Sequence, residues 1–380
     1  MARFSDWFSS SLVWSRVVSK SPRLAAIWSQ FGHDIAGAFV IDWLTIIVPC
    51  RHHGLVNGGH IVSIKPDGDL DWQVEKKAQI RGSFESNLLV RSQGTHDLFI
   101  DGNFTKWLQG HNLFGTDDLL GLVVAVMDEL STLLSLDPTD DNRAAWREGR
   151  FDLKRVDCTA MWQLPKRSDA RAWLRAAEFQ AKSRHGRPTV RGGTLYFGQH
   201  SRRWSIKFYA KGDELDATKT HKLSMDIPNR DKLYEWADNK LRGELVLHSL
   251  ELKDMGLHRG TSWHESLSLK LLLSRIESLN MADQFSLTPD IVGELPGRLI
   301  AVYKLWKDGE DLRGIFPRAT FYRYRKELLK HGIDIAVRQP HDNDNVIPLV
   351  RALRPEAIAQ VPDWAIDTPL YFSPRKFKKI

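Results

Sequence analysis

A chain of 380 residues, 42% of them hydrophobic, can bury a sizeable core, which excludes a disordered tail and leaves room for two modest domains. Its 54 Lys and Arg residues outnumber 47 Asp and Glu residues, and this excess favours a polyanionic partner such as nucleic acid without identifying one. Two distant cysteines without a CxxC pair argue against a disulfide framework or a zinc cluster and fit a reducing cytoplasm, and no apolar run reaches the roughly 18 residues that a membrane span needs.

The predicted elements start near residue 40. Residues 1–40 read as an N-terminal extension in which we expect no chemistry. Residues 40–48 (VIDWLTIIV) are rich in β-branched side chains and predict a buried strand. Between residues 60 and 100, short apolar runs alternate with turn signals, as in a strand meander. Residues 116–118 (TDD) supply an N-cap for apolar residues at helical spacing over residues 119–133.

The pattern then alternates between strands and helices. We expect a strand at residues 151–161, a helix at 168–183, a hairpin at 193–209, a helix at 230–238 and a strand at 241–247. A β-rich core crossed by a few helices indicates an α+β fold, with a central antiparallel sheet and helices on one face.

Three further boundaries follow from changes in pattern. We place the α+β domain at residues 41–260. Residues 261–338 show nearly continuous helical periodicity and predict a smaller helical domain, and residues 339–380 form a proline-rich basic tail.

A predicted strand within RRWSIKFYAKGDE places a tyrosine between two lysines. Strict alternation puts Lys207, Tyr209 and Lys211 on one face. A phenol can attack phosphorus, and a neighbouring cation favours the phenolate and screens the phosphate. The alternative is an edge strand with a solvated Lys-Tyr-Lys face.

Two other predicted strands place an acid two residues after an arginine. Arg155 and Asp157 share a face in KRVDCTA, and Arg242 and Glu244 share a face in LRGELVL. Carboxylates from neighbouring strands can hold a divalent metal ion such as Mg²⁺ or Mn²⁺, which would polarise a phosphate. The alternative is a pair of ordinary cross-strand salt bridges, but three such strands in one domain favour the functional reading.

Five sequence blocks, in their order and spacing, resemble a known family. They are IDWLT (41–45), GNFTKWLQGHNLFG (102–115), RVDCT (155–159), TLYFGQHSRRWSIKFYAKGDE (194–214) and LRGEL (241–245). The combination resembles the rolling-circle initiators of plasmids and, with the first two blocks, the gene II/X replication proteins of filamentous phages. The resemblance covers about residues 41–337. It implies a metal-dependent nicking and closing enzyme that keeps a 5′-phosphotyrosine while a free 3′-hydroxyl primes synthesis.

The resemblance also assigns roles. It makes Tyr209 the nucleophile, Lys211 its neighbour, Glu214 a further acid of that block, and Asp157 and Glu244 the metal candidates. The His-hydrophobic-His triplet that supplies metal ligands in many related initiators is absent from this chain.

His111 in QGHNLFG can stand in as a histidine ligand, or it can brace its turn. The candidates for contact with DNA phosphates in this domain are Arg155, Arg202, Arg203, Lys207 and Arg242, although exposed hairpin arginines are common.

Residues 295–335 predict two helices separated by a Gly/Pro turn, which suits a helix-turn-helix. The second helix carries the basic residues Arg318, Arg323, Arg325 and Lys326, and a solvated basic helix is the alternative. This part resembles the X portion of the gene II/X family, and it is assigned to origin binding or replication control rather than to catalysis. The expected partners are the DNA of its own phage or plasmid and a host helicase and polymerase.

Two other classes of protein remain open. A noncatalytic DNA-binding regulator would use the helix-turn-helix alone and leaves the Lys-Tyr-Lys strand and the paired acids unexplained. A tyrosine recombinase would need a mostly helical catalytic domain, and the β-rich surroundings of Tyr209 argue against it.

Overall fold

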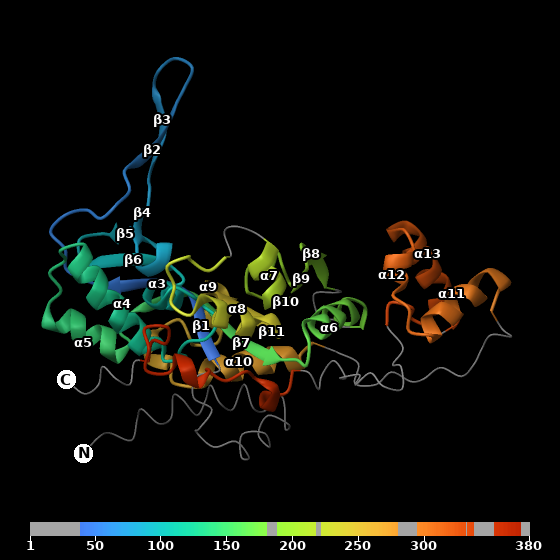
Figure 1. The fold of residues 1–380 in the computed structure, drawn as a ribbon. Helices are drawn as coiled ribbons and strands as arrows, with labels where there is room; N and C mark the ends of the chain where they lie inside the picture. The colour runs from blue at the N-terminus through green and yellow to red at the C-terminus, as the bar shows by residue number, and fades with distance from the viewer. Residues whose placement is uncertain are drawn as a thin grey trace.

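One antiparallel sheet of nine strands crosses the molecule (Figure 1). The computed structural model describes residues 39–180, 188–217, 222–279, 295–331, 333–337 and 353–373. In spatial order the strands are β4 (Ala78–Arg81), β5 (Asn87–Gln93), β6 (Asp97–Gly102), β1 (Phe39–Pro49), β7 (Asp152–Gln163), β11 (Lys240–His248), β10 (Trp204–Ala210), β9 (Thr194–Phe197) and β8 (Thr189–Arg191).

The main core lies between one face of this sheet and several helices. Alternate residues of β11, among them Leu241, Leu245 and Leu247, point into this core, as the predicted period of two requires. The helices that contribute to it include α4 (Leu119–Leu133), α5 (Asp140–Glu148), α6 (Arg167–Gln180), α9 (Ser249–Asp254) and α10 (Leu267–Glu277). The predicted N-cap of α4 is present, since the Asp118 side chain accepts a hydrogen bond from the Gly121 amide at 2.9 Å. The predicted α+β fold is confirmed.

A second, smaller core covers part of the opposite face. It forms under α7 (Lys211–Ala217), α8 (Arg230–Asp238) and the turn at residues 111–115. Residues 353–373 pack onto it as well, so this part of the predicted proline-rich basic tail contributes to a core. Because Ala359 donates its amide to the Met161 carbonyl at 2.8 Å, this segment is tied to β7. The basic end at residues 374–380 and residues 1–38 of the predicted extension (1–40) lie outside the described residues.

A third core belongs to the helical unit. It is formed by α11 (Gly297–Lys307), α12 (Leu312–Ile315) and α13 (Arg318–Leu328). Helix α10 instead packs into the main core, so the change from one core to the next follows α10 in this structure, whereas the sequence placed it near Gly260. The remaining short elements are α3 (Phe104–Gln109), η1 (Ser83–Glu85), η2 (Gly260–Ser262), η4 (Leu329–His331), η5 (Pro355–Ala357) and η6 (Asp363–Ala365).

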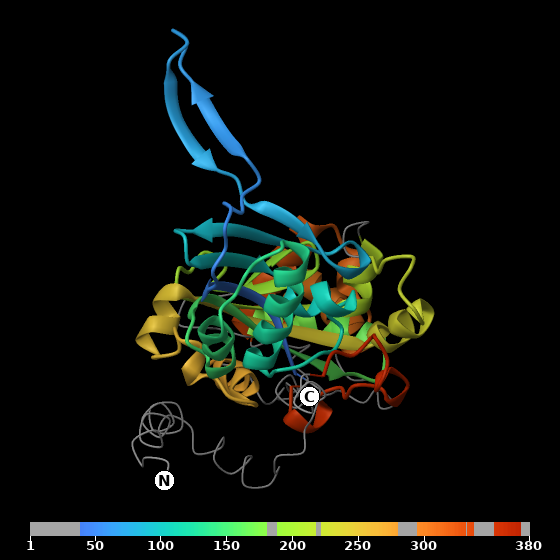
Figure 2. The same cartoon turned by 90° about the vertical axis from the view of Figure 1, so that its left-hand side faces the viewer.

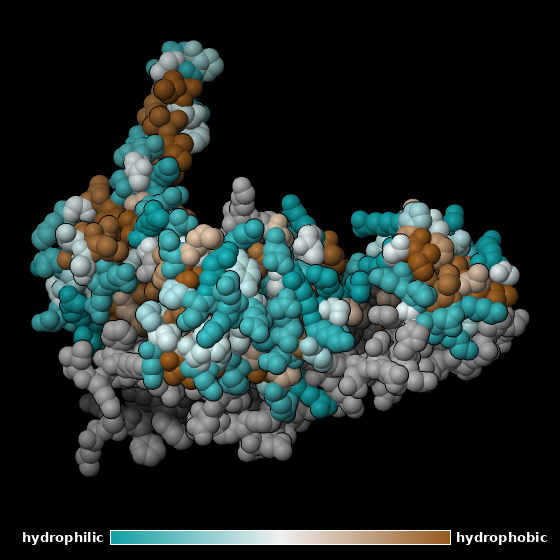
Figure 3. All heavy atoms as spheres, viewed as in Figure 1, coloured by the Kyte–Doolittle hydropathy of each residue, from teal (hydrophilic) through white to brown (hydrophobic). Residues whose placement is uncertain are grey.

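A separate two-stranded ribbon projects from the sheet (Figures 1 and 2). It consists of β2 (His60–Ile64) and β3 (Leu70–Glu75). Apolar side chains along both β2 and β3 are about half exposed, and much of the arm is brown in Figure 3. Among the helices of the described ranges, none is long and apolar enough to span a membrane.

Candidate active site

Three neighbouring strands near the middle of the sheet bring the predicted residues together. Glu244 on β11 pairs with Thr159 of β7 on one side and with Lys207 of β10 on the other. Tyr209 pairs with Arg242, two residues from Glu244. Residues directly opposite each other in a ladder share a face, and so do residues two apart on one strand. Asp157, Glu244 and Tyr209 therefore lie on one side of a single sheet, opposite the main core.

The hydroxyl of Tyr209 is held by an acid in the protein interior. It donates a hydrogen bond to Oε1 of Glu244, and the side chain is 7% exposed. Lys207 and Lys211 place their Nζ atoms 5.6 and 5.8 Å from the ring centroid. Burial raises the pKa of Tyr209 well above its ordinary value; Arg242 opposes this effect, and Glu244 adds to it. The phenol is thus protonated at rest, and Glu244 is the acceptor nearest to its proton.

Glu244 is buried among cations. Its Oε1 accepts a second hydrogen bond, from Nε of Arg242 at 2.8 Å, and its Oε2 lies 2.6 Å from Nζ of Lys207. Burial acts to raise the pKa of Glu244, but Lys207 and Arg242 outweigh it and lower the pKa below its ordinary range. The carboxylate consequently stays ionised.

Arg242 connects this acid to another strand, which corrects the expectation that it contacts DNA. The side chain is fully buried, and its Nη2 lies 2.8 Å from Oδ2 of Asp42 while Nη1 donates to the Asn112 carbonyl. Sequence reasoning did not assign Asp42. The signal was available, because a lone carboxylate within the apolar strand VIDWLTIIV requires a buried partner.

Asp157 lies on the adjacent strand and is held by Arg155. The arginine donates from Nε and Nη2 to the two carboxylate oxygens, both at 2.7 Å. Burial raises the pKa of Asp157 to about 6 although Arg155 opposes the rise, and the charges of Glu244 and Asp42 contribute to it. A fully buried acid that keeps so high a pKa beside an arginine is typical of functional sites.

The oxygen donors here suit a hard divalent cation. Asp157 and Glu244 supply carboxylates, and the buried Oγ1 of Thr159, directly opposite Glu244 in the ladder, has no hydrogen-bond partner among the described residues. In those residues, however, no three His, Cys, Asp or Glu side chains gather closely enough to hold a metal ion. The carboxylate oxygens instead form ion pairs with basic side chains.

Two residues of the predicted site, Lys211 and Glu214, belong to the helical layer above the sheet. The strand ends at Ala210, so Lys211 is the first residue of α7 and not part of the alternating strand. It is buried, and its Nζ lies 2.7 Å from Oε2 of Glu214. Burial lowers the pKa of Lys211, with Glu214 acting in the opposite direction.

His111 is fully buried in its turn. Its Nδ1 accepts a hydrogen bond from the Leu113 amide at 3.2 Å, and its ring meets that of Phe114 edge to face at 4.5 Å between centroids. Burial lowers the pKa of His111 to about 3. These are the contacts of a residue that braces a turn, which was the alternative reading.

The remaining basic candidates divide into exposed and paired residues. Arg202 and Arg203 are both exposed, but Arg203 also pairs with α9, since its Nη1 lies 3.3 Å from Glu251. On α13, Arg325 is buried and donates to both oxygens of Asp334 at 2.7 Å, which corrects its assignment to DNA. The other candidates on that helix, Arg318, Arg323 and Lys326, are exposed.

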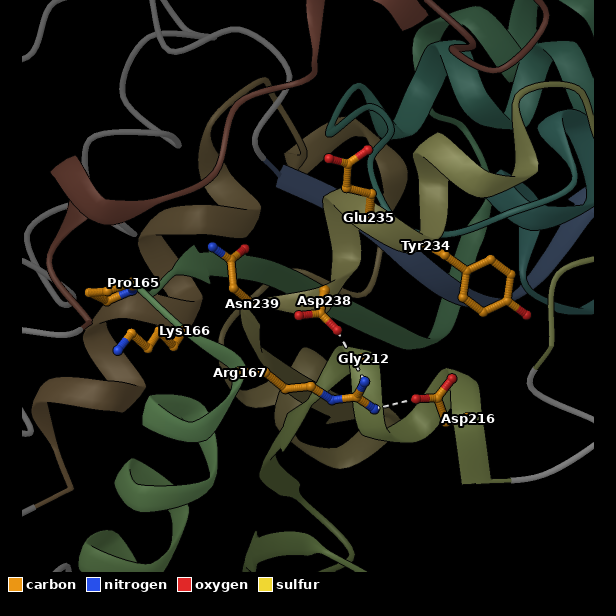
Figure 4. Close-up of a pocket in the computed structure, with 9 residues that line it drawn as sticks. All are labelled: Pro165, Lys166, Arg167, Gly212, Asp216, Tyr234, Glu235, Asp238 and Asn239. Carbon is orange, nitrogen blue, oxygen red and sulfur yellow. Dashed lines mark hydrogen bonds and ion pairs between the residues drawn. The ribbon is translucent and has the colours of Figure 1, made fainter.

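A cavity of about 680 Å³ lies elsewhere, between the start of α6, α7 and the end of α8 (Figure 4). Arg167 in its wall is 3.0 Å from Asp238 and 2.5 Å from Asp216. It is also 2.7 Å from Asp213. This arginine therefore ties three elements together, and the cavity includes none of the paired acids beside Tyr209.

Comparison with known proteins shows the family of this chain. Residues 40–266 match the N-terminal family model of the phage gene II replication-associated protein, and residues 296–370 match its C-terminal counterpart. The replication-associated protein of this description from Enterobacteria phage I2-2 is 42% identical over 323 residues, which cover 83% of this chain and 93% of that protein. The protein of the same description from Enterobacteria phage fd is 24% identical over 316 residues, covering 68% and 74% of the two chains.

Among solved structures, a Rolling Circle Replication Initiator Protein from Geobacillus stearothermophilus aligns over 56% of this chain and 75% of its own, at 13% identity and a TM-score of 0.25. A score this low adds nothing to the argument. The two family matches and the identity to the phage I2-2 protein suffice, and the chain belongs to the family of phage gene II replication-associated proteins.

Proposed function

We propose that this protein is a phage rolling-circle replication initiator that nicks one DNA strand at an origin and rejoins it at termination. The observation that carries the proposal is the hydrogen bond from the Tyr209 phenol to Glu244, with Asp157 on the next strand of the same face. Membership of the gene II replication-associated family supports the role in replication.

The chemical step is a transesterification. The Tyr209 oxygen attacks phosphorus, its proton leaves along the hydrogen bond to Glu244 and passes on to solvent, the bond from phosphorus to the 3′ oxygen breaks, and that oxygen takes a proton from solvent. The products are a 5′-phosphotyrosine and a free 3′-hydroxyl. Because Tyr209 is buried in this structure, DNA binding must displace the side chains that cover it.

Asp157, Glu244 and Thr159 are the residues we propose to hold a divalent metal ion, Mg²⁺ or Mn²⁺. Such an ion supplies charge that polarises the phosphate and stabilises the leaving oxygen. The orphaned hydroxyl of Thr159 and the two buried carboxylates support this assignment.

The exposed cations Arg318, Arg323 and Lys326 on α13 are proposed to bind the phosphates of the origin. The 3′-hydroxyl would then serve a host polymerase and helicase in the cytoplasm of the bacterial host.

The test uses the full chain with supercoiled and single-stranded DNA of its own replicon, in Mg²⁺, Mn²⁺ or EDTA. We expect a protein-linked 5′ end that requires metal and is absent in Tyr209→Phe. Tyr196→Phe is the matched control, because Tyr196 pairs with Lys207 in the neighbouring strand and carries no proposed role. Cleavage in EDTA, or full cleavage by Tyr209→Phe, would contradict the mechanism. Binding without cleavage would favour the noncatalytic regulator.

A further inference from the structure

The two proposed metal-binding acids are shielded from solvent by their own counter-ions. The side chains of Asp157 and Glu244 are each 3% exposed, whereas those of Arg155 and Lys207, which pair with them, are 34% and 31% exposed. The cations thus form the solvent side of the site.

The oxygens of Glu244 are divided between two kinds of partner. Oε1 receives Tyr209 and Arg242, while Oε2 receives Lys207. Arg242 is fully buried and anchored to Asp42, so it cannot leave without disrupting the sheet. Lys207 can swing into solvent on its flexible stem and leave the contact between Glu244 and Tyr209 in place.

The charges of this cluster already balance. The three acids Asp42, Asp157 and Glu244 face three cations, Arg155, Arg242 and Lys207. A divalent ion added to this set would leave two uncompensated positive charges in a largely buried site, which is costly. The balance is restored if two cations move out to a phosphate.

We propose that Lys207 and Arg155 are exchangeable counter-ions, which a divalent metal ion displaces from Glu244 and Asp157 and which then bind the phosphate of the DNA strand. This inference rests on the proposed function and adds a consequence. Metal binding and DNA binding become coupled, since each makes the other more favourable, and such coupling is reciprocal. Lysine and arginine form strong charge-assisted contacts with phosphate oxygens.

Binding of Mn²⁺ alone, followed by electron paramagnetic resonance on the full chain, tests the exchange without any cleavage assay. Lys207→Met removes the competitor of the metal ion, so we expect it to bind Mn²⁺ at least threefold tighter than the wild type. Lys207→Arg should remain close to the wild type. Lys253→Met is the control for net charge. Lys253 is exposed on α9, which packs against the main core, on the other side of the sheet from Glu244.

The second arm measures coupling in the Tyr209→Phe background, where the proposed chemistry cannot proceed. A short single-stranded oligonucleotide should tighten Mn²⁺ binding at least threefold, and Lys207→Met should reduce that gain. Arg155→Gln provides the same comparison at Asp157 should Lys207→Met fold poorly.

The outcomes separate the two proposals. If Lys207→Met and Arg155→Gln bind Mn²⁺ no tighter than the wild type, the exchange is refuted while the nicking chemistry stands. If the wild type binds no Mn²⁺ and Glu244→Gln behaves identically, the metal site of the proposed function fails, and the exchange fails with it.

Discussion

Replacing Asp157 by asparagine should stabilise the fold at neutral pH, even though it removes a residue proposed to be essential for cleavage. Burial raises the pKa of Asp157 from its ordinary 3.8 to about 6, against the opposing effect of Arg155. Between these two pH values the folded protein holds a proton that the unfolded chain has released. The free energy of unfolding consequently falls as the pH rises through this window.

The size of the effect follows from the same pKa. A difference of about two pH units corresponds to about 3 kcal/mol of folding free energy. Protonated Asp157 contributes this stability in full below pH 3.8, and it is lost once the pH has risen past about 6. The asparagine side chain cannot ionise, so Asp157→Asn should match the wild type near pH 4 and be up to about 3 kcal/mol more stable near pH 7.5.

Urea unfolding in EDTA, followed by tryptophan fluorescence at several pH values, measures this difference. Asp101→Asn is the control of opposite sign. Burial acts to raise the pKa of Asp101, but hydrogen bonds from Thr45, Trp43 and Lys77 together lower it. That variant should lose stability relative to the wild type above pH 4. An Asp157→Asn protein that is less stable than the wild type at pH 7.5, or a difference that does not change with pH, would refute the reasoning.

Three further predictions concern neighbouring residues. Arg242→Met should cost about 3–5 kcal/mol in urea unfolding, because it leaves two buried acids without their shared cation. Gly243→Ala should cost about 1–3 kcal/mol in the same assay, since its added Cβ would lie 2.8 Å from the Trp162 ring in the packed core. Arg325→Ala should destabilise the helical unit by about 3 kcal/mol, whereas Arg323→Ala should leave its melting unchanged and reduce the salt dependence of DNA binding by about one phosphate contact. Equal effects of the last two on melting would contradict the separation of paired from exposed arginines.

Strand periodicity predicted most of this fold because it is a local property of the chain. The apolar alternation in β10 and β11 places the same residues in the core as the structure does. The position of Lys211, expected on the face of β10, was wrong for an equally physical reason. Lys211 continues the alternation in sequence, but its side chain turns inward to Glu214 within a short helix. No local sequence pattern predicts such a buried ion pair.

The tail and the basic residues depend on contacts between parts of the chain that are distant in sequence, and a local pattern does not predict such contacts. Proline spacing marked residues 339–380 as a tail, yet residues 353–373 pack into the second core and contact β7, which is distant in sequence. Arg325 and Arg242 carry the same charge as their exposed neighbours, and only the fold decides which arginine meets an acid and which meets solvent.

The candidate site was predicted in part from local alternation and depends in part on the fold. Alternation placed Tyr209, Asp157 and Glu244 on one face of their strands, but it could not assign a partner to each charge, because pairing depends on which strands are adjacent. Once β11 lies between β7 and β10, Glu244 must share its face with Thr159, Lys207 and the phenol at once. Removing a cation from this cluster leaves a buried negative charge with less positive charge beside it, which is unfavourable. Removing an acid relieves this electrostatic cost. For this reason the stability of Asp157→Asn and the Mn²⁺ affinity of Lys207→Met report on one electrostatic balance, and both should rise if the buried acids carry the charges assigned to them.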